Sequence, residues 1–325
     1  MRLMPLTGML PRYSVAGQEN DSMIPAFFAT ILFCFSAVSA NRATRLAGSI
    51  EANFWRLVFA TTLLAIWAHG FGGGLGGRAF LVFFISGVIG FGVGDVALYL
   101  AYPRLGSRLT LLLVHCGAAP IAALGEWIHL GNALSLGEIL ASATILLGVA
   151  LALAPAENPH IGRRDLAWGM GFGLLAAAGQ GLGAVMSRVG YAMNAESGTD
   201  FDGMTIAYQR VLGGLLIGVI TFAWTVSRSN PRSDRAQTGG SFGRPPSGAV
   251  PWILMTGISG PTLGVACYQW ALEGAKSGVV LPIVATAPLM VMPLSRWMEG
   301  DRPGYRAVIG GTVAVIGVIA LGLTT

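Results

Sequence analysis

Charged residues are scarce in this sequence: Asp, Glu, Lys and Arg make up 11% of its 325 residues, against about 25% in soluble domains. Hydrophobic residues account for 54%, and one soluble core could not bury so much apolar surface in a chain of this length. The composition therefore predicts an integral membrane protein. The net charge of +5 comes from arginines placed singly or in pairs in short loops, which is typical of membrane proteins and does not indicate nucleic-acid binding.

The residues that build disulfides, metal centres and active sites are also few. Cys34, Cys116 and Cys267 lie in apolar segments without CxxC or Cys/His spacing, so neither a disulfide framework nor a metal site is indicated. No H-x-x-x-H, H-E-x-x-H or Asp/His cluster occurs. We therefore expect no enzyme, no cofactor and no metal. The absence of a ring of like charges or a repeated filter sequence argues against an ion channel.

Long apolar runs, in contrast, are plentiful. About 20 apolar residues are needed to cross a hydrocarbon core about 30 Å thick, and such runs must be helical because open strands would leave backbone groups unpaired in lipid. Ten segments meet this description. They lie near residues 24–41, 53–71, 79–101, 109–130, 135–154, 167–187, 205–226, 250–271, 278–298 and 305–323.

Two of these segments repeat one another. Residues 87–101 read G-V-I-G-F-G-V-G-D-V-A-L-Y-L-A and residues 257–271 read G-I-S-G-P-T-L-G-V-A-C-Y-Q-W-A. Corresponding Gly-interrupted helices are typical of transporters that bind substrate between two repeats. The matched positions, at a constant offset of 170, are Gly87/Gly257, Gly90/Gly260, Gly94/Gly264 and Ala101/Ala271.

Other landmarks extend the match along the chain. Arg56, in N-F-W-R, pairs with Arg210, in A-Y-Q-R, and Pro120 matches Pro288 within a residue. Five helices per half is an odd number, so the halves must lie in the membrane with opposite orientation. The predicted fold is all-α, with ten transmembrane helices forming two inverted five-helix repeats. The expected division is a loose tail (1–22), a first repeat (23–154), a linker (155–166) and a second repeat (167–325).

With these landmarks in place, the sequence resembles the EamA family of the drug/metabolite transporter superfamily. The resemblance covers about 24–323 and rests on the order of the landmarks, including the turn Gly300-Asp301-Arg302-Pro303 before a Gly-rich last helix. Asn132 and Asp301 stand where the family usually has Glu. The resemblance implies a multi-pass inner-membrane carrier of small metabolites or drugs, often an exporter, driven by ion exchange or by the substrate gradient.

Few polar residues lie within the predicted helices, and the sharpest case is Asp95. A carboxylate at membrane depth is costly and is usually functional, and the equivalent position, Val265, shows that the repeat itself does not require it. We therefore expect an unpaired Asp95 in a cavity, coupling transport to protons, with Tyr99 one turn away on the same face. A purely structural hydrogen-bonding role is the alternative. His115 could pass a proton, or be a packed residue.

Aromatic and amide side chains could line the same pocket, although each could equally join two helices. Arg56 and Arg210 are interpreted as structural anchors, with anion binding as the alternative. Gly90, Gly94, Gly260 and Gly264 form G-x-x-x-G faces for close helix packing, and Pro120 and Pro288 are structural landmarks. The further pocket candidates are Gln180, Tyr208, Tyr268, Gln269 and Trp270.

The remaining expectations concern partners and placement. The partners would be a small-molecule substrate and the lipid bilayer, with protons and a second copy of the chain as further candidates. A structural or lipid-handling membrane protein is the alternative function. The first segment ends Val38-Ser39-Ala40 like a signal-peptide cleavage site, but Arg42 matches Arg188 and favours a retained helix. Loop arginines favour termini outside, whereas the resemblance implies termini inside for some relatives.

Overall fold

The computed structural model describes residues 15–130, 135–152, 161–198, 201–228, 245–274, 280, 283–300 and 302–324. Within these ranges all regular structure is helical, and the described residues of the expected segments lie mostly in helices. The helices of the first half are α1 (Val15–Ala47), α2 (Ser49–Gly70), α3 (Phe80–Gly87), η1 (Val88–Gly94), α4 (Asp95–Leu111), η2 (Leu112–Cys116), α5 (Gly117–Leu130) and α6 (Leu136–Ala152).

The second half follows the same order. Its elements are α7 (Arg163–Glu196), α8 (Gly203–Arg228), α10 (Val250–Gly257), η4 (Ile258–Thr262), α11 (Leu263–Gly274), α13 (Ala287–Met290), α14 (Met292–Glu299) and α15 (Tyr305–Thr324). Six candidate spans are long and apolar enough to cross a membrane. They are Ile24–Ala47, Phe80–Ala122, Arg163–Glu196, Gly203–Arg228, Val250–Glu273 and Tyr305–Leu323.

Three expected boundaries are wrong. The first helix begins at Val15, inside the expected loose tail 1–22, and α7 begins at Arg163, inside the expected linker 155–166. The described part of the ninth segment, from residue 283 on, is not one helix: turns at 285–286 and at Val291 flank the short helices α13 and α14. Pro288 and Pro293 lack the backbone N–H that a continuous helix would use, which accounts for the interruption.

The third and fourth segments are separated by a kink at Gly106. Its φ of 75° lies in the left-handed region, which glycine adopts at little steric cost. The helix resumes at Ser107, whose backbone N–H donates to Oε2 of Glu299 at 3.2 Å. A carboxylate at the start of a helix satisfies an otherwise free donor and complements the helix dipole. The end of α14 thereby fixes the turn in the first half.

In the part of the chain that the structure describes, three stretches of π-helix interrupt the α-helices: η1, η2 and η4. The stretches η1 and η4 begin at Val88 and Ile258, positions that correspond at the repeat offset of 170. Such π-helical turns inside α-helices are uncommon and are found frequently at functional sites. The Gly-rich runs identified in the sequence are therefore the places where the local helix geometry changes.

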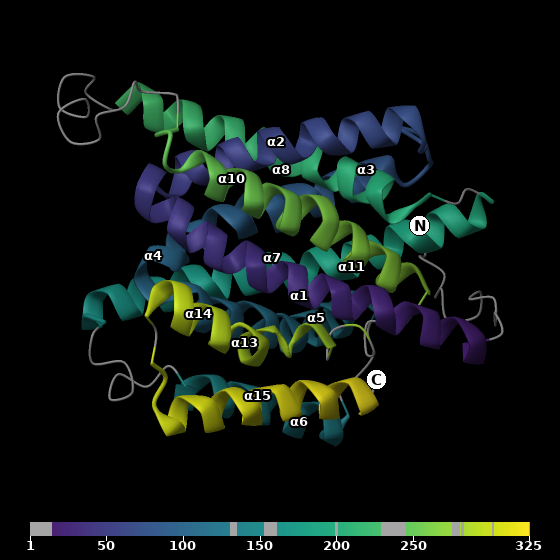
Figure 1. Ribbon diagram of the computed structural model, residues 1–325. Helices are drawn as coiled ribbons and strands as arrows, with labels where there is room; N and C mark the ends of the chain where they lie inside the picture. Colours follow the sequence, from purple (N-terminus) through teal and green to yellow (C-terminus); the bar gives the residue numbers. More distant parts are fainter. Residues whose placement is uncertain are drawn as a thin grey trace.

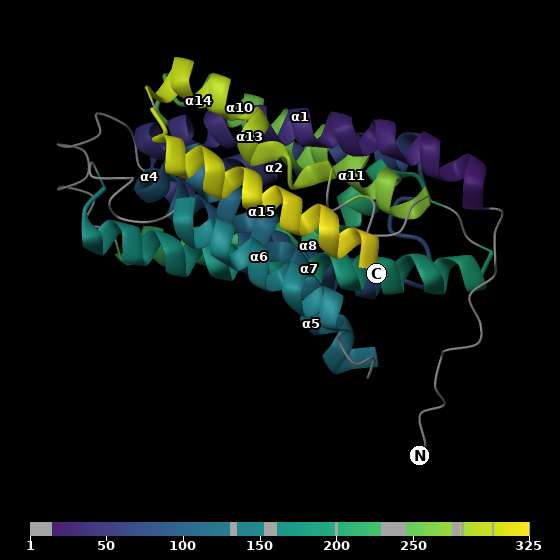
Figure 2. The ribbon, with the colours of Figure 1, turned by 90° about the horizontal axis from the view of Figure 1, so that it is seen from below.

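Packing between the halves is reciprocal. The first helix, α1, packs against α10 and α11, while α7 packs against α3 and α4. Likewise α2 packs against α8, and α6 against α15. Figure 1 shows α2 and α8 at one side of the bundle and α6 with α15 at the other, and Figure 2 shows the latter pair side by side as well. The first helix thus contacts two helices of the second half.

Glycines bring α6 and α15 into backbone contact. A Cβ added to Gly148 would lie 2.6 Å from the carbonyl oxygen of Gly310, and one added to Gly310 would lie 2.6 Å from the oxygen of Gly148. Near the other end, a Cβ on Gly317 would lie 2.9 Å from the backbone nitrogen of Ile145. Small residues allow helices in lipid to approach closely enough for dispersion contacts between backbones.

We therefore expect Gly148→Ala to destabilise the protein, because the new methyl group would force α6 away from α15. Overpacking of this kind costs about 1–3 kcal/mol, which would appear as a lower unfolding temperature in detergent. The matched control is Gly171→Ala in α7, where an added Cβ meets nothing within 4 Å. That variant should be as stable as the parent or slightly more stable. Equal unfolding temperatures for the two variants would contradict the close contact.

Candidate functional site

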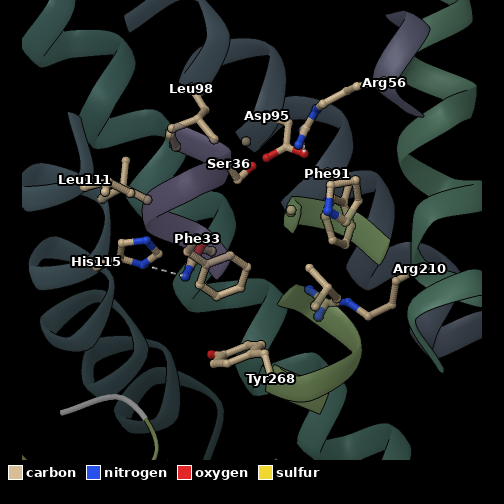
Figure 3. A pocket seen from close by; sticks show the side chains of 18 of the residues that line it. Phe33, Ser36, Arg56, Phe91, Asp95, Leu98, Leu111, His115, Arg210 and Tyr268 are labelled. Carbon is tan, nitrogen blue, oxygen red and sulfur yellow. Dashed lines mark hydrogen bonds and ion pairs between the residues drawn. The ribbon is translucent and has the colours of Figure 1, made fainter. Parts of the chain in front are cut away.

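A cavity lies between helices of both halves. It contains about 760 Å³ of space not filled by atoms, a volume that includes open space at its mouth. Its walls come from α1, α2, α4, α7, α8 and α11 and from all three π-helical stretches. Figure 3 shows polar side chains from several of these helices directed into it. They include Arg56, Asp95, His115, Gln180, Arg210 and Tyr268.

One end of the cavity is occupied by an ion pair. Arg56 on α2 donates from Nη2 to Oδ2 of Asp95, the first residue after η1. Its Nε donates to Oδ1 of Asn53 at 3.1 Å, and its guanidinium carbon lies 4.5 Å from the ring centroid of Tyr99. The side chains of Arg56 and Asp95 are 4% and 14% exposed. The charge of Arg56 is thus matched by a carboxylate, an amide and an aromatic face.

The prediction that Asp95 is an unpaired carboxylate is wrong. It is bound to Arg56, which removes the reason for expecting it to exchange protons freely. Tyr99 does not share the cavity with it. That ring is fully buried beneath Arg56, and its hydroxyl lies 3.0 Å from Oγ1 of Thr256. The helical spacing that was expected to place both side chains in the cavity did not account for the neighbouring arginine.

The second arginine has a different environment. Arg210 on α8 is 5% exposed, and its Nε has no hydrogen-bond acceptor. Within the described ranges no carboxylate forms an ion pair with it. Its guanidinium carbon lies 5.2 Å from the ring centroid of Phe91. Room for the guanidinium comes from Gly90 and Gly183, where an added Cβ would lie 3.3 and 3.1 Å from Nη2.

The other polar side chains of the cavity wall include an imidazole, an amide and a phenol, those of His115, Gln180 and Tyr268. Nδ1 of His115 and Nε2 of Gln180 lie 3.1 Å apart, and the His115 ring stacks on Phe33 with centroids 5.6 Å apart. The Tyr268 ring packs edge-on against the Phe33 ring, with centroids 6.2 Å apart. The Tyr268 hydroxyl is buried without a hydrogen-bond partner. His115, Gln180 and Tyr268 therefore line the cavity, as expected from the sequence. Their roles in substrate binding or coupling stay predictions.

Three other candidates lie elsewhere, contrary to expectation. The hydroxyl of Tyr208 lies 3.2 Å from Nε2 of His69, outside the cavity. Gln269 is fully buried, and its Oε1 accepts from the hydroxyl of Tyr191 at 3.2 Å. Trp270 is 60% exposed. These positions were selected by residue type within an apolar segment, and residue type does not reveal which way a helix face points.

The glycines and prolines named in the sequence lie at close contacts. Gly90, Gly94 and Gly260 line the cavity, whereas a Cβ on Gly264 would lie 2.9 Å from the ring of Phe33. A Cβ on Gly94 would lie 3.3 Å from the Cα of Gly179 on α7. Pro120 and Pro288 are both buried.

Sequence reasoning missed several lining residues, among them Phe33, Ser36 and Tyr102. Ser36 is a hydroxyl residue inside an apolar helix and could have been selected on that ground. Phe33 carries no distinguishing signal in the sequence. Among the described residues, no three His, Cys, Asp or Glu side chains are grouped in a way that could hold a metal ion.

Comparison with known proteins now identifies the second half. Residues 167–323 match the model of the EamA-like transporter family. These residues belong to that family, part of the drug/metabolite transporter superfamily. The resemblance seen in the sequence is confirmed, and with its apolar helices the chain is a multi-pass membrane protein. The family is one of membrane transporters of small solutes.

The other comparisons concern the whole chain. A solved structure described as "Crystal structure of protein" has a TM-score of 0.61 against this chain, at 14% identity, and the alignment covers 94% of this chain and 97% of the other. At that identity the likeness shows the fold alone. No curated protein matches the sequence.

We expect Asp95→Asn to destabilise the protein, because it leaves the buried guanidinium of Arg56 without its anion. Removing one partner of a buried pair costs about 3–5 kcal/mol, which should lower the unfolding temperature in detergent markedly. The double variant Arg56→Gln/Asp95→Asn should be more stable than Asp95→Asn alone, since neither charge is then left unpaired.

The matched control for this series is Asp165→Asn. Asp165 is an exposed carboxylate in the first turn of α7, where substitutions usually change stability by no more than about 0.5 kcal/mol. If Asp95→Asn behaves like this control, the ion pair does not contribute to the fold.

Proposed function

We propose that this protein is a secondary transporter that moves a small metabolite or drug across the inner membrane through the cavity, with export as the physiological direction. The observation that carries the proposal is the composition of the cavity wall. Both members of four pairs at the repeat offset of 170 line the same cavity. The pairs are Gly90/Gly260, Phe91/Pro261, Asp95/Val265 and Leu98/Tyr268.

The proposal includes an inverted repeat. Reciprocal contacts support it: a Cβ on Gly87 would collide with the backbone carbonyl of Arg210, and one on the equivalent Gly257 would lie 3.4 Å from the carbonyl oxygen of Arg56. Each half thus places its Gly-rich helix on the arginine of the other half. Two five-helix units that exchange equivalent contacts fit a rotation of about 180° around an axis in the membrane plane.

Alternating access would use the π-helical stretches. Each of the three contributes residues to the cavity wall, and η1 and η4 occupy equivalent positions. A π-helical turn replaces the regular i to i−4 bonding of an α-helix, so the helix can bend there at lower cost than elsewhere. We propose that α3 and α10 move relative to α4 and α11 about these turns, opening the cavity to one side at a time.

The alternative is a structural or lipid-handling protein, for which a dry, closely packed interior would be expected. The cavity favours transport over this alternative, because its wall carries two guanidinium groups, a carboxylate, an imidazole and an amide. Polar groups inside a membrane protein are costly and usually mark a solute pathway. A protein that served only to hold lipids or partners would have no reason to retain them.

The transport proposal predicts solute flux in proteoliposomes. The purified full-length protein should move at least one member of a panel of amino acids, amines, nucleosides and hydrophobic drugs faster than protein-free liposomes. Running the panel with and without a pH gradient shows whether protons drive the flux, with His115 as the remaining titratable candidate in the wall. A matched control is the protein carrying Gln180→Trp, which should fill the cavity and stop flux. No flux across the panel would favour the structural alternative.

Alternating access predicts two-sided accessibility of a cavity residue. In a chain with Cys34, Cys116 and Cys267 replaced by Ala, Leu98→Cys should react with a membrane-impermeant maleimide both in right-side-out and in inside-out vesicles. The control is Leu147→Cys on α6, a residue outside the cavity that is 69% exposed on the helix surface; in the bilayer it should react from neither side. Labelling of Leu98→Cys from one side only would contradict the proposed movement.

A further inference from the structure

The two arginines differ in the partners that the chain supplies. Arg56 donates a hydrogen bond to Asn53, three residues earlier, and forms an ion pair with Asp95 on α4. At the equivalent positions around Arg210 the sequence has Ala207 and Val265. Both are buried and belong to one apolar cluster. The second half therefore keeps the guanidinium but lacks the carboxylate and the amide that neutralise it in the first.

An unmatched guanidinium is expensive at this depth. Charged groups inside membrane proteins are ordinarily paired with one another or with polar backbone groups, and a buried charge without a partner carries a large desolvation cost. Arg210 retains an unsatisfied Nε and is in contact with the face of Phe91. A cation–π contact compensates the charge of a guanidinium less than a carboxylate does.

A second unsatisfied donor points to the same space. Tyr268 on α11 is 4% exposed, lines the cavity, and has a hydroxyl without a hydrogen-bond partner. Arg210 lies within electrostatic reach of Tyr268 and also of Asp95, the carboxylate that is hydrogen-bonded to Arg56. Two guanidinium groups thus share one carboxylate, which leaves one positive charge in excess. Figure 3 shows the guanidinium of Arg210 extending into the cavity between Phe91 and Tyr268. Two residues that line the same cavity thus each carry a buried donor without a partner.

We propose that Arg210 and Tyr268 form a binding site for a carboxylate group of the transported molecule. The inference rests on the proposed transport function and specifies the chemical class of its substrate. A guanidinium can donate two parallel hydrogen bonds to a carboxylate, and the Tyr268 hydroxyl adds a third donor. With Asp95 already paired to Arg56, one carboxylate brings the ligand-bound cavity to charge balance, so a monoanion fits better than a dianion.

The rest of the wall specifies what carries the carboxylate. Phe33, Phe91 and Leu98 present apolar surface beside the two donors. An apolar or aromatic body attached to one carboxylate therefore matches the cavity, with the anion at Arg210 and the body against these side chains. In this arrangement the ligand provides the group that Asp95 provides in the first half.

Binding can be tested with phenylacetate and its uncharged counterpart phenylacetamide. In the purified full-length protein, phenylacetate at millimolar concentration should raise the unfolding temperature, and phenylacetamide should raise it much less. Arg210→Gln should weaken phenylacetate binding roughly 10- to 100-fold, the range expected for losing hydrogen bonds to a charged group. Arg210→Lys should retain part of the affinity. Equal effects of the two probes, or no effect of phenylacetate, would overturn the proposal.

A substitution at Val265 tests the geometry without removing the arginine. Val265→Asp restores the carboxylate found at Asp95 in the first half, so it should pair with Arg210 and abolish phenylacetate binding. The matched control, Val265→Asn, has nearly the same shape without the charge and should still bind phenylacetate. Even if Arg210→Gln fails to fold, equal loss of binding in both Val265 variants would refute the site.

The outcomes separate this site from the transport function. If phenylacetate binds and responds to Val265→Asp but no solute is moved, the carboxylate site stands and transport is rejected. If a solute is moved at the same rate by the parent and by Arg210→Gln, and is neutral or cationic, transport stands and the carboxylate site is rejected.

Discussion

Much of this structure depends on how two guanidinium groups, those of Arg56 and Arg210, are buried among apolar helices. Each charge needs space, because a guanidinium is wide and planar, and each needs electrostatic compensation, because lipid supplies none. Space comes from glycine: Gly90 and Gly183 leave room beside Arg210, and Gly260 leaves room beside Arg56. Compensation comes from Asp95, Asn53 and Tyr99 around Arg56. Around Arg210 the chain supplies the face of Phe91 and a more distant interaction with Asp95, and we propose that a ligand in the cavity supplies the rest of the compensation.

The glycines that make this room also determine how the halves meet. Because Gly87 and Gly257 contact the backbone at the arginine of the opposite half, the two Gly-rich helices are held where a side chain would collide. The same run of small residues contains the π-helical turns η1 and η4. Close packing and altered helix geometry therefore occur in the same few residues. A bundle built in this way can be tight at its interfaces and still have defined places where its helices bend, which is what a moving carrier requires.

Much of this was accessible from the sequence, and what was not has physical causes. The ten helical segments follow from apolar length, and the pairing of Arg56 with Arg210 and of Gly90 with Gly260 follows from internal similarity. Side-chain direction was the harder part. Trp270 lies in the same helix as Tyr268 yet points outward, 60% exposed, because a uniformly apolar helix gives no periodic signal for its inner face. The pairing of Asp95 with Arg56 could not be predicted either, since a separation of 39 positions along the chain says nothing of their distance in space. The interruption of the ninth segment could have been inferred from Pro288 and Pro293.

The difference between the halves makes the surroundings of the two arginines in the cavity wall chemically different: Arg56 forms an ion pair with Asp95, and Arg210 forms none with any described carboxylate. If the two halves were identical, each arginine would have its own carboxylate. The cavity would then carry no net charge and would have little affinity for a charged solute. In this protein Val265 stands where the first half has Asp95, and Ala207 stands where it has Asn53. Neither residue is required for the contacts that the glycines make, so the helix packing is kept. Arg210, however, lacks the carboxylate and the amide that are bound to Arg56. The matched positions therefore lie at the contacts between the halves, and we propose that the departures from symmetry determine which solute is recognised. In a duplicated carrier, the positions where equivalent residues differ inside the cavity are the first place to look for its substrate.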